Sequence, residues 1–356
     1  MPGRHGLADS CAVTVSASRL LGIDTGGTYT DAVIYDEGSG LVLAKAKSPT
    51  THDDLGIGIR GAIDAVLAEA AVEPASIDLV SLSTTLATNA LVENTGRPAC
   101  LISIGFDERA LQRAGLADAV GSDRLVMIDG GHTSHGLEAA PLDLEALAAA
   151  VKTVAHDVDA FAVTAQFSVR NAAHELAARD VIRAQSSLPI TLSHRLSARL
   201  NGPKRAVTAL LNARLIPMID DLVATAERTL AQRGVSAPLM VVRGNGSLVS
   251  AAFVRDRPIE TILSGPAASL VGAAHLTNIE DAVIADMGGT TTDIAVLRGG
   301  QPDFSADGAH VGGHQTMVEA VRMFTHGLGG DSEISLPDLA SARAGTVLVA
   351  GPRRVI

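Results

Sequence analysis

Aromatic residues are scarce in this chain, which has no tryptophan, two tyrosines and six phenylalanines. Basic residues are not in excess either, because 28 Lys and Arg stand against 39 Asp and Glu and give a formal net charge of −11. Nucleic-acid binding needs a basic surface and often aromatic side chains that stack on bases. The composition therefore argues against a nucleic-acid partner.

Cysteine is nearly absent as well, since Cys11 and Cys100 are the only two. Two such residues imply neither a disulfide framework nor a cysteine-based zinc site. No uninterrupted apolar run is long enough to span a membrane. Residues 1–18 lack the continuous apolar core of a signal peptide. We expect a flexible leader over 1–18, no membrane partner and a cytoplasmic protein.

The chain does contain enough residues and apolar content for two domains, with 356 residues of which 47% are hydrophobic. Segments typical of strands alternate with helical patterns, which predicts an α/β fold with a parallel or mixed sheet. Asp143 is expected to cap one helix. A longer helical pattern over 204–232 contains Pro217, where we expect a kink.

One short pattern occurs twice. Residues 24–31 (DTGGTYTD) match residues 286–293 (DMGGTTTD) at six of eight positions. Apolar runs precede and follow each copy, so each is predicted to be a β-hairpin whose turn is rich in Gly and Thr. Glycines let backbone N–H groups approach an anion closely, and Thr hydroxyls add donors. Two such turns facing each other would hold a polyphosphate from both sides.

A single pattern of this kind is more often an ordinary hairpin turn than a nucleotide site. Two copies with matching flanking strands favour the phosphate-binding interpretation. The leading residues, Asp24 and Asp286, stand at the ends of equivalent strands. Each is a candidate to hold a divalent cation, directly or through water.

Four segments resemble the hydantoinase A/oxoprolinase family of the actin-like ATPase superfamily. They are residues 22–31, 83–91 (STTLATNAL), 264–268 (SGPAA) and 286–293, in the family's order. The resemblance implies an α/β fold of two ribonuclease-H-like domains with a nucleotide cleft between them. It places an N-terminal domain with the first hairpin at 19–200, and a second ATPase-like domain, incomplete at its C-terminus, at 201–356.

The same resemblance implies ATP-dependent hydrolysis of a cyclic amide such as a hydantoin or 5-oxoproline, with ATP and Mg²⁺. Phosphorylation of the ring carbonyl oxygen would give an activated species that water can attack. Positioning and charge neutralisation would supply the catalysis. Because family members are commonly about twice this length or work with a second subunit, we expect a hydantoinase-type partner or a missing C-terminal domain. Self-association stays open.

The resemblance also assigns roles to residues. Asp24 and Asp286 are the catalytic and metal-binding candidates, while Asp31 and Asp293 are expected to orient the turns. Phosphate contacts are implied for the glycines and threonines of both turns, namely Gly26, Gly27, Thr28, Thr30, Gly288, Gly289, Thr290 and Thr291.

Two further segments are candidates for the cleft. Thr84 and Thr85, with Thr88 and Asn89, precede or begin a helix whose N-terminus would favour an anion. Hydroxyls that cap a buried helix are an equal alternative. Gly329, Gly330 and Asp331 form a Gly-rich turn that would pass close to the base or ribose, with a plain surface loop as the alternative.

Other polar residues are weaker candidates. Asn245 stands where relatives are expected to have an acidic residue, which leaves a role for that position in doubt. Five histidines could supply metal ligands, but their spacing is loose and no cysteine joins them. Hydrogen-bonding loop histidines are therefore the favoured interpretation for His132, His135, His310, His314 and His326.

Three classes of function remain open from the sequence. The first is an ATP-dependent amidohydrolase or its ATPase subunit. The second is a small-molecule kinase that uses the same cleft, and the third is a non-enzymatic nucleotide switch or activator. Analysis of the product separates the first two, because a kinase releases a stable phosphoester.

Overall fold

The computed structural model describes residues 18–51, 54–289, 291–305, 307–335 and 349–354. The leader expected over 1–18 therefore lies outside the described residues except for Ser18, and Cys11 and Thr290 also lie outside them. Among the residues that are described, no helix is both long and apolar enough to cross a membrane.

A mixed six-stranded sheet, called here the N-terminal sheet, has the strand order β10-β9-β4-β1-β2-β3. Strands β1, β2 and β3 are antiparallel neighbours, whereas β4 and β9 run parallel to β1. Alternate residues of β1, Leu21 and Ile23, share a core with Ile59 and Ile63 of α1 (Leu55–Ala70). The strands are β1 (Arg19–Thr25), β2 (Tyr29–Asp36), β3 (Leu41–Pro49), β4 (Leu79–Thr84), β9 (Leu239–Val242) and β10 (Leu248–Ser250).

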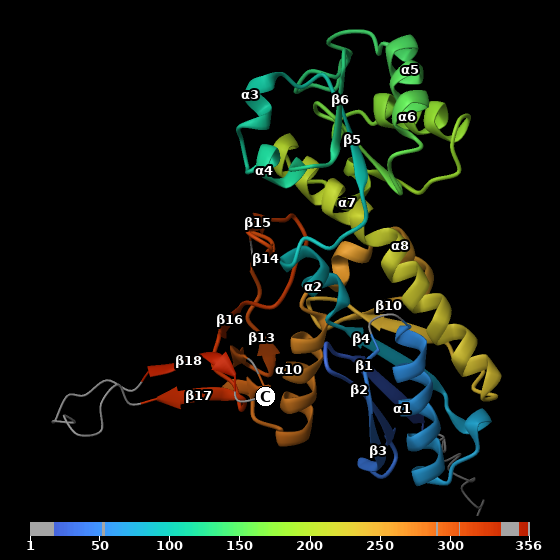
Figure 1. The fold of residues 1–356 in the computed structure, drawn as a ribbon, viewed down its shortest axis with the longest axis vertical. Coiled ribbons are helices and arrows are strands. Elements are labelled where there is room, and N and C mark those ends of the chain that lie inside the picture. The colour runs from blue at the N-terminus through green and yellow to red at the C-terminus, as the bar shows by residue number, and fades with distance from the viewer. Residues whose placement is uncertain (1–17, 52–53, 290, 306, 336–348, 355–356) are drawn as a thin grey trace, which may run out of the picture.

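A second sheet, called the parallel sheet, occupies a separate lobe at the top of Figure 1. Its order is β6-β5-β7-β8, and all neighbours are parallel. Every residue of β5 and β7 is buried, as expected for parallel strands covered on both faces. Asp143 caps α5 as predicted, since its Oδ1 accepts from Ala146 N at 2.9 Å. The elements are β5 (Ala99–Ile104), β6 (Arg124–Ile128), β7 (Ala160–Ala165), β8 (Ile190–Leu192), α5 (Leu144–Val154) and α6 (Ala173–Arg183).

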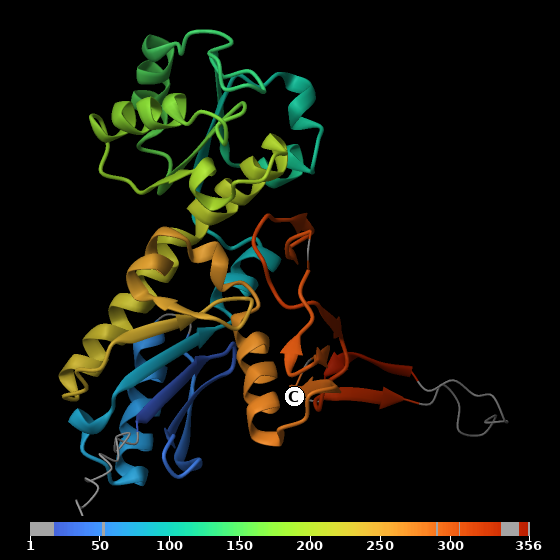
Figure 2. The same ribbon diagram turned by 180° about the vertical axis from the view of Figure 1, so that it is seen from behind.

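Helix α8 (Gly202–Gln232) joins these two parts of the molecule. It packs on β7 and β5 of the parallel sheet and on α1 beside the N-terminal sheet. Figures 1 and 2 show it running from the upper lobe along the flank of the lower one. The helix predicted over 204–232 is confirmed, and it continues through Pro217. The N-terminal sheet takes strands from both sides of residue 200, because β9 pairs with β4.

A third sheet, called the C-terminal sheet, contains the second copy of the repeated pattern. Strands β11, β12 and β13 follow one another in it, and β16 pairs with β12. Helix α10 (Ser264–Thr277) packs against both the N-terminal and the C-terminal sheet and stands between them in Figure 1. The strands are β11 (Ala282–Met287), β12 (Thr292–Arg298), β13 (Gln301–Pro302) and β16 (Met323–His326).

Short elements complete the described part of the fold. They are η1 (Pro74–Ser76), α2 (Leu86–Val92), α3 (Glu108–Leu111), α4 (Leu116–Val120), α7 (Ser193–Leu196), α9 (Ala251–Asp256), η2 (Pro258–Thr261), β14 (His310–Val311), β15 (His314–Gln315), β17 (Ser332–Ser335) and β18 (Val349–Arg354).

Candidate functional site

The two copies of the repeated pattern form hairpins of the same register. Asp24 of β1 pairs with Asp31 of β2, and Asp286 of β11 pairs with Asp293 of β12. The predicted hairpins are therefore present, and their leading aspartates stand at equivalent positions.

The turns are closed by equivalent bonds as well. Gly26 N donates to Tyr29 O at 3.0 Å, and Gly288 N donates to Thr291 O at 2.9 Å. These four residues occupy matching positions of the two sequence patterns. The repeat in the sequence is thus a repeat of backbone geometry.

The tip of the first turn is open to solvent, whereas its base is buried. Gly27 and Thr28 are exposed. Thr30 is fully buried, and its hydroxyl lies 3.0 Å from that of Thr50. The hydroxyl of Thr25 is buried and has no hydrogen-bond partner among the described residues. A buried hydroxyl is rarely left unpaired, so a partner for Thr25 Oγ1 would have to come from water or a ligand oxygen.

Asp24 is the most perturbed carboxyl of this site. It is half-buried, and its Oδ1 accepts a hydrogen bond from Ser83 Oγ at 2.6 Å. Burial raises the pKa of Asp24, and the charges of Asp31 and Asp286 raise it further, against the lowering effects of Ser83 and Lys47. Asp286 belongs to the other hairpin, so the second hairpin is near enough for its leading carboxylate to act electrostatically on Asp24.

A cavity of about 720 Å³ adjoins Asp24. Asp31 and Ser83 also line it from the N-terminal sheet, and Ala268 lines it from α10. Lys47 Nζ lies 3.3 Å from Asp31 Oδ1 at its edge. The site therefore combines the half-buried carboxyl of Asp24, a second carboxyl that Lys47 partly neutralises, and room for a small ligand.

The second turn is flanked by the Gly-rich segment predicted to approach the nucleotide. Gly330 N donates to Gly288 O at 2.9 Å, and Asp331 N donates to Gly289 O at 2.8 Å. Gly288 and Gly289 are exposed, and a Cβ added at Gly289 would collide with the carboxylate of Asp331. The structure thus brings the second turn together with the glycine-rich segment that includes Gly329. Thr290 lies outside the described residues.

Thr84 and Thr85 lie directly beside the first turn, since Thr85 N donates to Thr25 O at 3.1 Å. The Thr84 hydroxyl is buried; it accepts from Leu86 N at 3.0 Å and donates to Thr25 O at 3.3 Å. These contacts fit the capping alternative for Thr84. The hydroxyl of Thr88 accepts from Leu263 N at 2.9 Å. A role of these residues in ligand binding stays a prediction.

The start of α10 belongs to the site, although the sequence did not single it out as a functional segment. Ser264 Oγ donates to Thr84 O at 2.9 Å. A Cβ added at Gly265 would lie 3.7 Å from Asp24 Oδ1 and 3.4 Å from Thr85 Cγ2. The run of small residues in SGPAA is the sequence signal that coincides with this approach of α10 to the first hairpin.

Of the candidate histidines, His132 contacts another histidine, and its Nδ1 is buried with no hydrogen-bond partner among the described residues. His132 is buried, and its ring lies 4.3 Å from that of His174 between centroids. Burial lowers the pKa of His132, and His174 lowers it further. Burial also lowers the pKa of His314. Within the described part of the chain, no group of three His, Cys, Asp or Glu is arranged to hold a metal ion.

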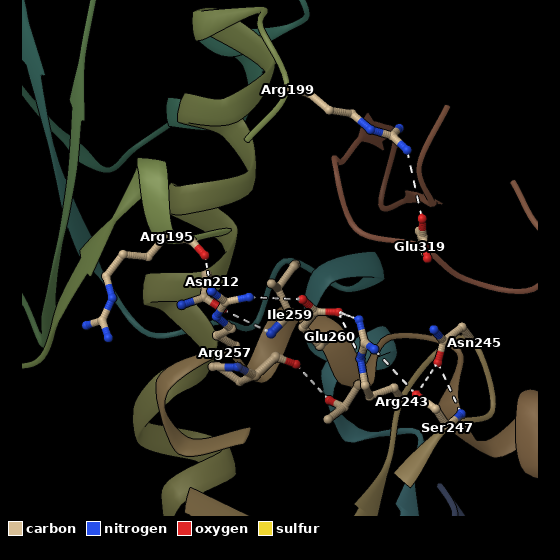
Figure 3. A network of polar contacts seen from close by, with 12 residues as sticks. Arg195, Arg199, Asn212, Arg243, Asn245, Ser247, Arg257, Ile259, Glu260 and Glu319 are labelled. Carbon is tan, nitrogen blue, oxygen red and sulfur yellow. Dashed lines mark hydrogen bonds and ion pairs between the residues drawn. The ribbon is translucent and has the colours of Figure 1, made fainter. Parts of the chain in front are cut away.

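Asn245 forms part of a structural network rather than of the hairpin site. Its Oδ1 accepts from Ser247 N at 3.1 Å and from Ser247 Oγ at 2.7 Å. Figure 3 shows how this turn adjoins the buried pair of Arg243 and Glu260, with Arg243 Nη2 and Glu260 Oε2 2.5 Å apart. An amide at Asn245 therefore stabilises the turn between β9 and β10.

Comparison with known proteins gives two family matches. The model of the hydantoinase/oxoprolinase N-terminal region covers residues 20–186, and the hydantoinase/oxoprolinase model covers residues 205–349. The alpha subunit of caprolactamase from Pseudomonas jessenii is 30% identical over 351 residues, covering 91% of this chain and 50% of that protein. The gamma subunit of acetophenone carboxylase from Aromatoleum aromaticum is 28% identical over 317 residues. The match covers 79% of this chain and 42% of that protein. The chain spans about half the length of these curated relatives.

Solved structures give the same picture of the fold. The crystal structure of ATP-dependent caprolactamase from Pseudomonas jessenii matches with a TM-score of 0.75 at 28% identity, covering 94% of this chain and 51% of that one. Nucleotide-free acetone carboxylase matches with a TM-score of 0.76 at 20% identity. The match covers 95% of this chain and 51% of that one. The predicted α/β fold of the actin-like ATPases is confirmed.

Proposed function

The chain belongs to the hydantoinase/oxoprolinase family, and on that premise we propose that it forms the ATP-binding part of an enzyme that opens a cyclic amide. One observation carries the proposal. Two hairpins of identical register each have a glycine turn and a leading aspartate, and the charge of Asp286 in one raises the pKa of Asp24 in the other. A ligand that bears several phosphates is the ligand that fits such a paired site.

The exposed turns supply the phosphate contacts in this proposal. Backbone N–H groups of the glycines would hold the phosphates, because an unsubstituted Cα permits close approach. The unpaired hydroxyl of Thr25 is one further donor at the base of the first turn. Phosphoryl transfer depends chiefly on positioning and on neutralising charge, and both are tasks that rigid turns at strand ends perform.

No three acidic or histidine side chains of the described residues are arranged to hold a metal, so magnesium would be held here by two carboxylates together with phosphate and water. Asp24, Asp31 and Asp286 place negative charge near one another, and Lys47 offsets it only in part. Mg²⁺ prefers oxygen ligands and is commonly held by one or two carboxylates together with phosphate and water. Asp24 and Asp286 are the residues that would hold it. The ion would supply charge neutralisation at the transferred phosphate.

The names of the relatives support a carbonyl compound as the second substrate. Caprolactamase is named for a lactam, and we propose a lactam or cyclic ureide here. The carboxylase relatives support a second candidate, ATP-dependent carboxylation of a ketone. Lactams and ketones share a carbonyl oxygen that can accept a phosphoryl group. Since these relatives are named as subunits, we also propose that a second subunit or a further region of the same protein takes part.

Transfer of an oxygen label tests the proposal. A lactam carrying ¹⁸O in its carbonyl is incubated with ATP, Mg²⁺ and the protein, together with its partner or remaining region. Phosphorylation of the carbonyl oxygen, followed by attack of water on the carbon, would release phosphate that contains ¹⁸O. Unlabelled phosphate from a lactam-stimulated reaction would contradict the proposed mechanism. A stable labelled phosphoester would instead identify a kinase. A labelled ketone, with bicarbonate added as the carboxyl donor, tests the second candidate.

A further inference from the structure

The parallel sheet has a topological switch point that the nucleotide site does not use. After β5, the chain adds β6 on one side of β5 and then adds β7 and β8 on its other side. The direction in which strands are added to the sheet therefore reverses between β5 and β7. In open α/β sheets, ligands bind outside the carboxyl ends of the strands at such a point. This end of the sheet lies in the upper lobe of Figure 1.

A cavity of about 710 Å³ lies at this switch point. Phe106 follows β5, Phe167 follows β7, and Asn201 precedes α8; all three line the cavity. Its volume is in the range typical of small-molecule sites. Most of its lining is apolar, and Leu200, at the rim, is 52% exposed.

The backbone around the cavity is unusual. Ala114, Phe167 and Asn201 all line it and all have positive φ, of 56°, 54° and 89°. For a bulky residue such as Phe167 this conformation is a clear outlier. Its carbonyl accepts from Arg170 N at 2.8 Å and from Asn171 N at 3.2 Å. Such conformations persist where surrounding structure holds them, and they concentrate at ligand sites.

Arg205 gives the cavity wall a buried positive charge. It is 1% exposed, and its guanidinium donates to Ser193 Oγ at 3.1 Å, to Ser168 Oγ at 3.2 Å and to the carbonyl of Arg199 at 3.1 Å. None of these three acceptors is a carboxylate. The nearby Glu175 accepts from the Ser193 hydroxyl, so one hydroxyl separates it from the guanidinium.

A second cation stands at the rim. Arg113 lines the cavity and is exposed. Among the described residues, no carboxylate pairs with it. The acidic lining residue Asp107 uses Oδ1 to cap α3, accepting from Ala110 N at 3.0 Å. The positive end of α8 also faces this region, so the cavity combines apolar walls with two arginines and one lining carboxylate, that of Asp107.

We propose that this cavity binds a small organic carboxylate with a short apolar body. The carboxylate pairs with Arg113 and with the guanidinium of Arg205, as arginine prefers, while Phe106, Phe167 and Leu200 contact the apolar part. The site is separate from the paired hairpins, and the proposal does not depend on the proposed ATP-dependent function.

The absence of tryptophan from the chain makes a direct test possible. A single tryptophan introduced as Leu200→Trp reports on the cavity, and Leu137→Trp, at another exposed leucine of the same lobe, is the matched control. Hexanoate is the probe, and uncharged hexanamide is its comparison. We expect saturable fluorescence change with hexanoate in Leu200→Trp only, with a dissociation constant on the order of 1 mM or lower.

Arginine variants then test the charge. In the Leu200→Trp background, Arg113→Gln should weaken hexanoate binding by about tenfold, as expected for loss of a charged hydrogen bond. Arg109→Gln, at an exposed arginine of α3 outside the cavity lining, should leave binding unchanged. Because Arg205 is buried, Arg205→Gln also tests folding and is interpreted only with a thermal melt. The proposal would be overturned if Leu200→Trp gave no fluorescence change with hexanoate, or the same change with hexanamide as with hexanoate. It would also be overturned if Arg113→Gln and Arg109→Gln changed hexanoate binding equally.

Discussion

Asp24 is a residue at which stability and function oppose each other. Burial raises its pKa above the ordinary aspartate value of 3.8, and the charges of Asp31 and Asp286 add to this effect. Folding therefore favours the protonated carboxyl. This contribution to stability is present below pH 3.8, and it is lost as the pH rises through the higher pKa that Asp24 has in the folded protein. At pH 7 the ionised side chain lowers the free energy of unfolding, and a bound cation would offset that effect.

Replacement of Asp24 by asparagine should separate the two properties. We expect Asp24→Asn to raise the melting temperature of the nucleotide-free protein at pH 7, because the amide is uncharged and can still accept from Ser83. ATP turnover should fall by roughly 100-fold or more, the scale seen when a transition-state contact is removed. Thermal melts and ATPase rates on the same preparation measure both effects.

An aspartate with the opposite pKa shift provides the control. Asp64 Oδ1 and Oδ2 accept from Arg233 Nε and Nη2 at 2.6 and 2.8 Å, and these bonds lower the pKa of Asp64. Its contribution is present at pH 7 and is lost as the pH falls through the folded pKa, so Asp64→Asn should not raise the melting temperature. A lower melting temperature in Asp24→Asn would mean that the charged carboxylate stabilises its hairpin.

At the scale of elements, one buried carboxylate joins the β9–β10 turn to η2. Glu260 is 4% exposed and pairs with Arg243 at 2.5 Å and with Arg257 at 3.8 Å (Figure 3). Removing one partner of a buried ion pair leaves the other charge uncompensated. We expect Glu260→Gln to lower the free energy of unfolding by about 3 kcal/mol, measured by urea denaturation.

A surface pair of the same chemistry is the comparison. Glu227 Oε2 lies 2.9 Å from Arg255 Nη2, but its side chain is 43% exposed. Exposed pairs contribute roughly 0–1 kcal/mol, so Glu227→Gln should have a small effect. Equal losses in the two variants would show that Glu260 does not act through its burial.

The elements themselves were largely predictable, because their signals are local. The helix over 204–232 and the Asp143 cap of α5 agree with the sequence, and both hairpins have the predicted turns. Their pairing was not predictable in the same way. Nothing in the residues around β4 and β9 indicates that these strands, separated by the whole parallel sheet in the chain, lie side by side.

Some residues of the site were predictable from local sequence patterns, whereas others depend on contacts between distant segments. The repeated turns indicated Gly27 and Gly289 directly. The contact of Gly265 with Asp24 depends on how α10 packs between two sheets, which no local pattern specifies. The capping role of Thr84 was one of two alternatives, and only its contacts with Thr25 and Leu86 favour it.

At the scale of the whole molecule, the account requires two distant hairpins to bind one ligand. Calorimetric titration with ATP and Mg²⁺ tests this most directly, using Gly27→Val and Gly289→Val. A Cβ at Gly27 meets only Asn89 Nδ2 at 3.6 Å, so this variant should stay folded while its side chain blocks the phosphate. Gly272→Val, at a position with no neighbouring atom within 4 Å, is the control.

We expect the unaltered protein and the Gly272→Val control to bind ATP–Mg²⁺ with an affinity between micromolar and millimolar, the range typical of enzyme substrates. Gly27→Val and Gly289→Val should each abolish the binding heat, with melts that show folded protein; at Gly289 the new side chain also has to displace the Asp331 carboxylate. Normal binding by either hairpin variant would mean that its turn does not contact the phosphates, and the two-sided site would be wrong.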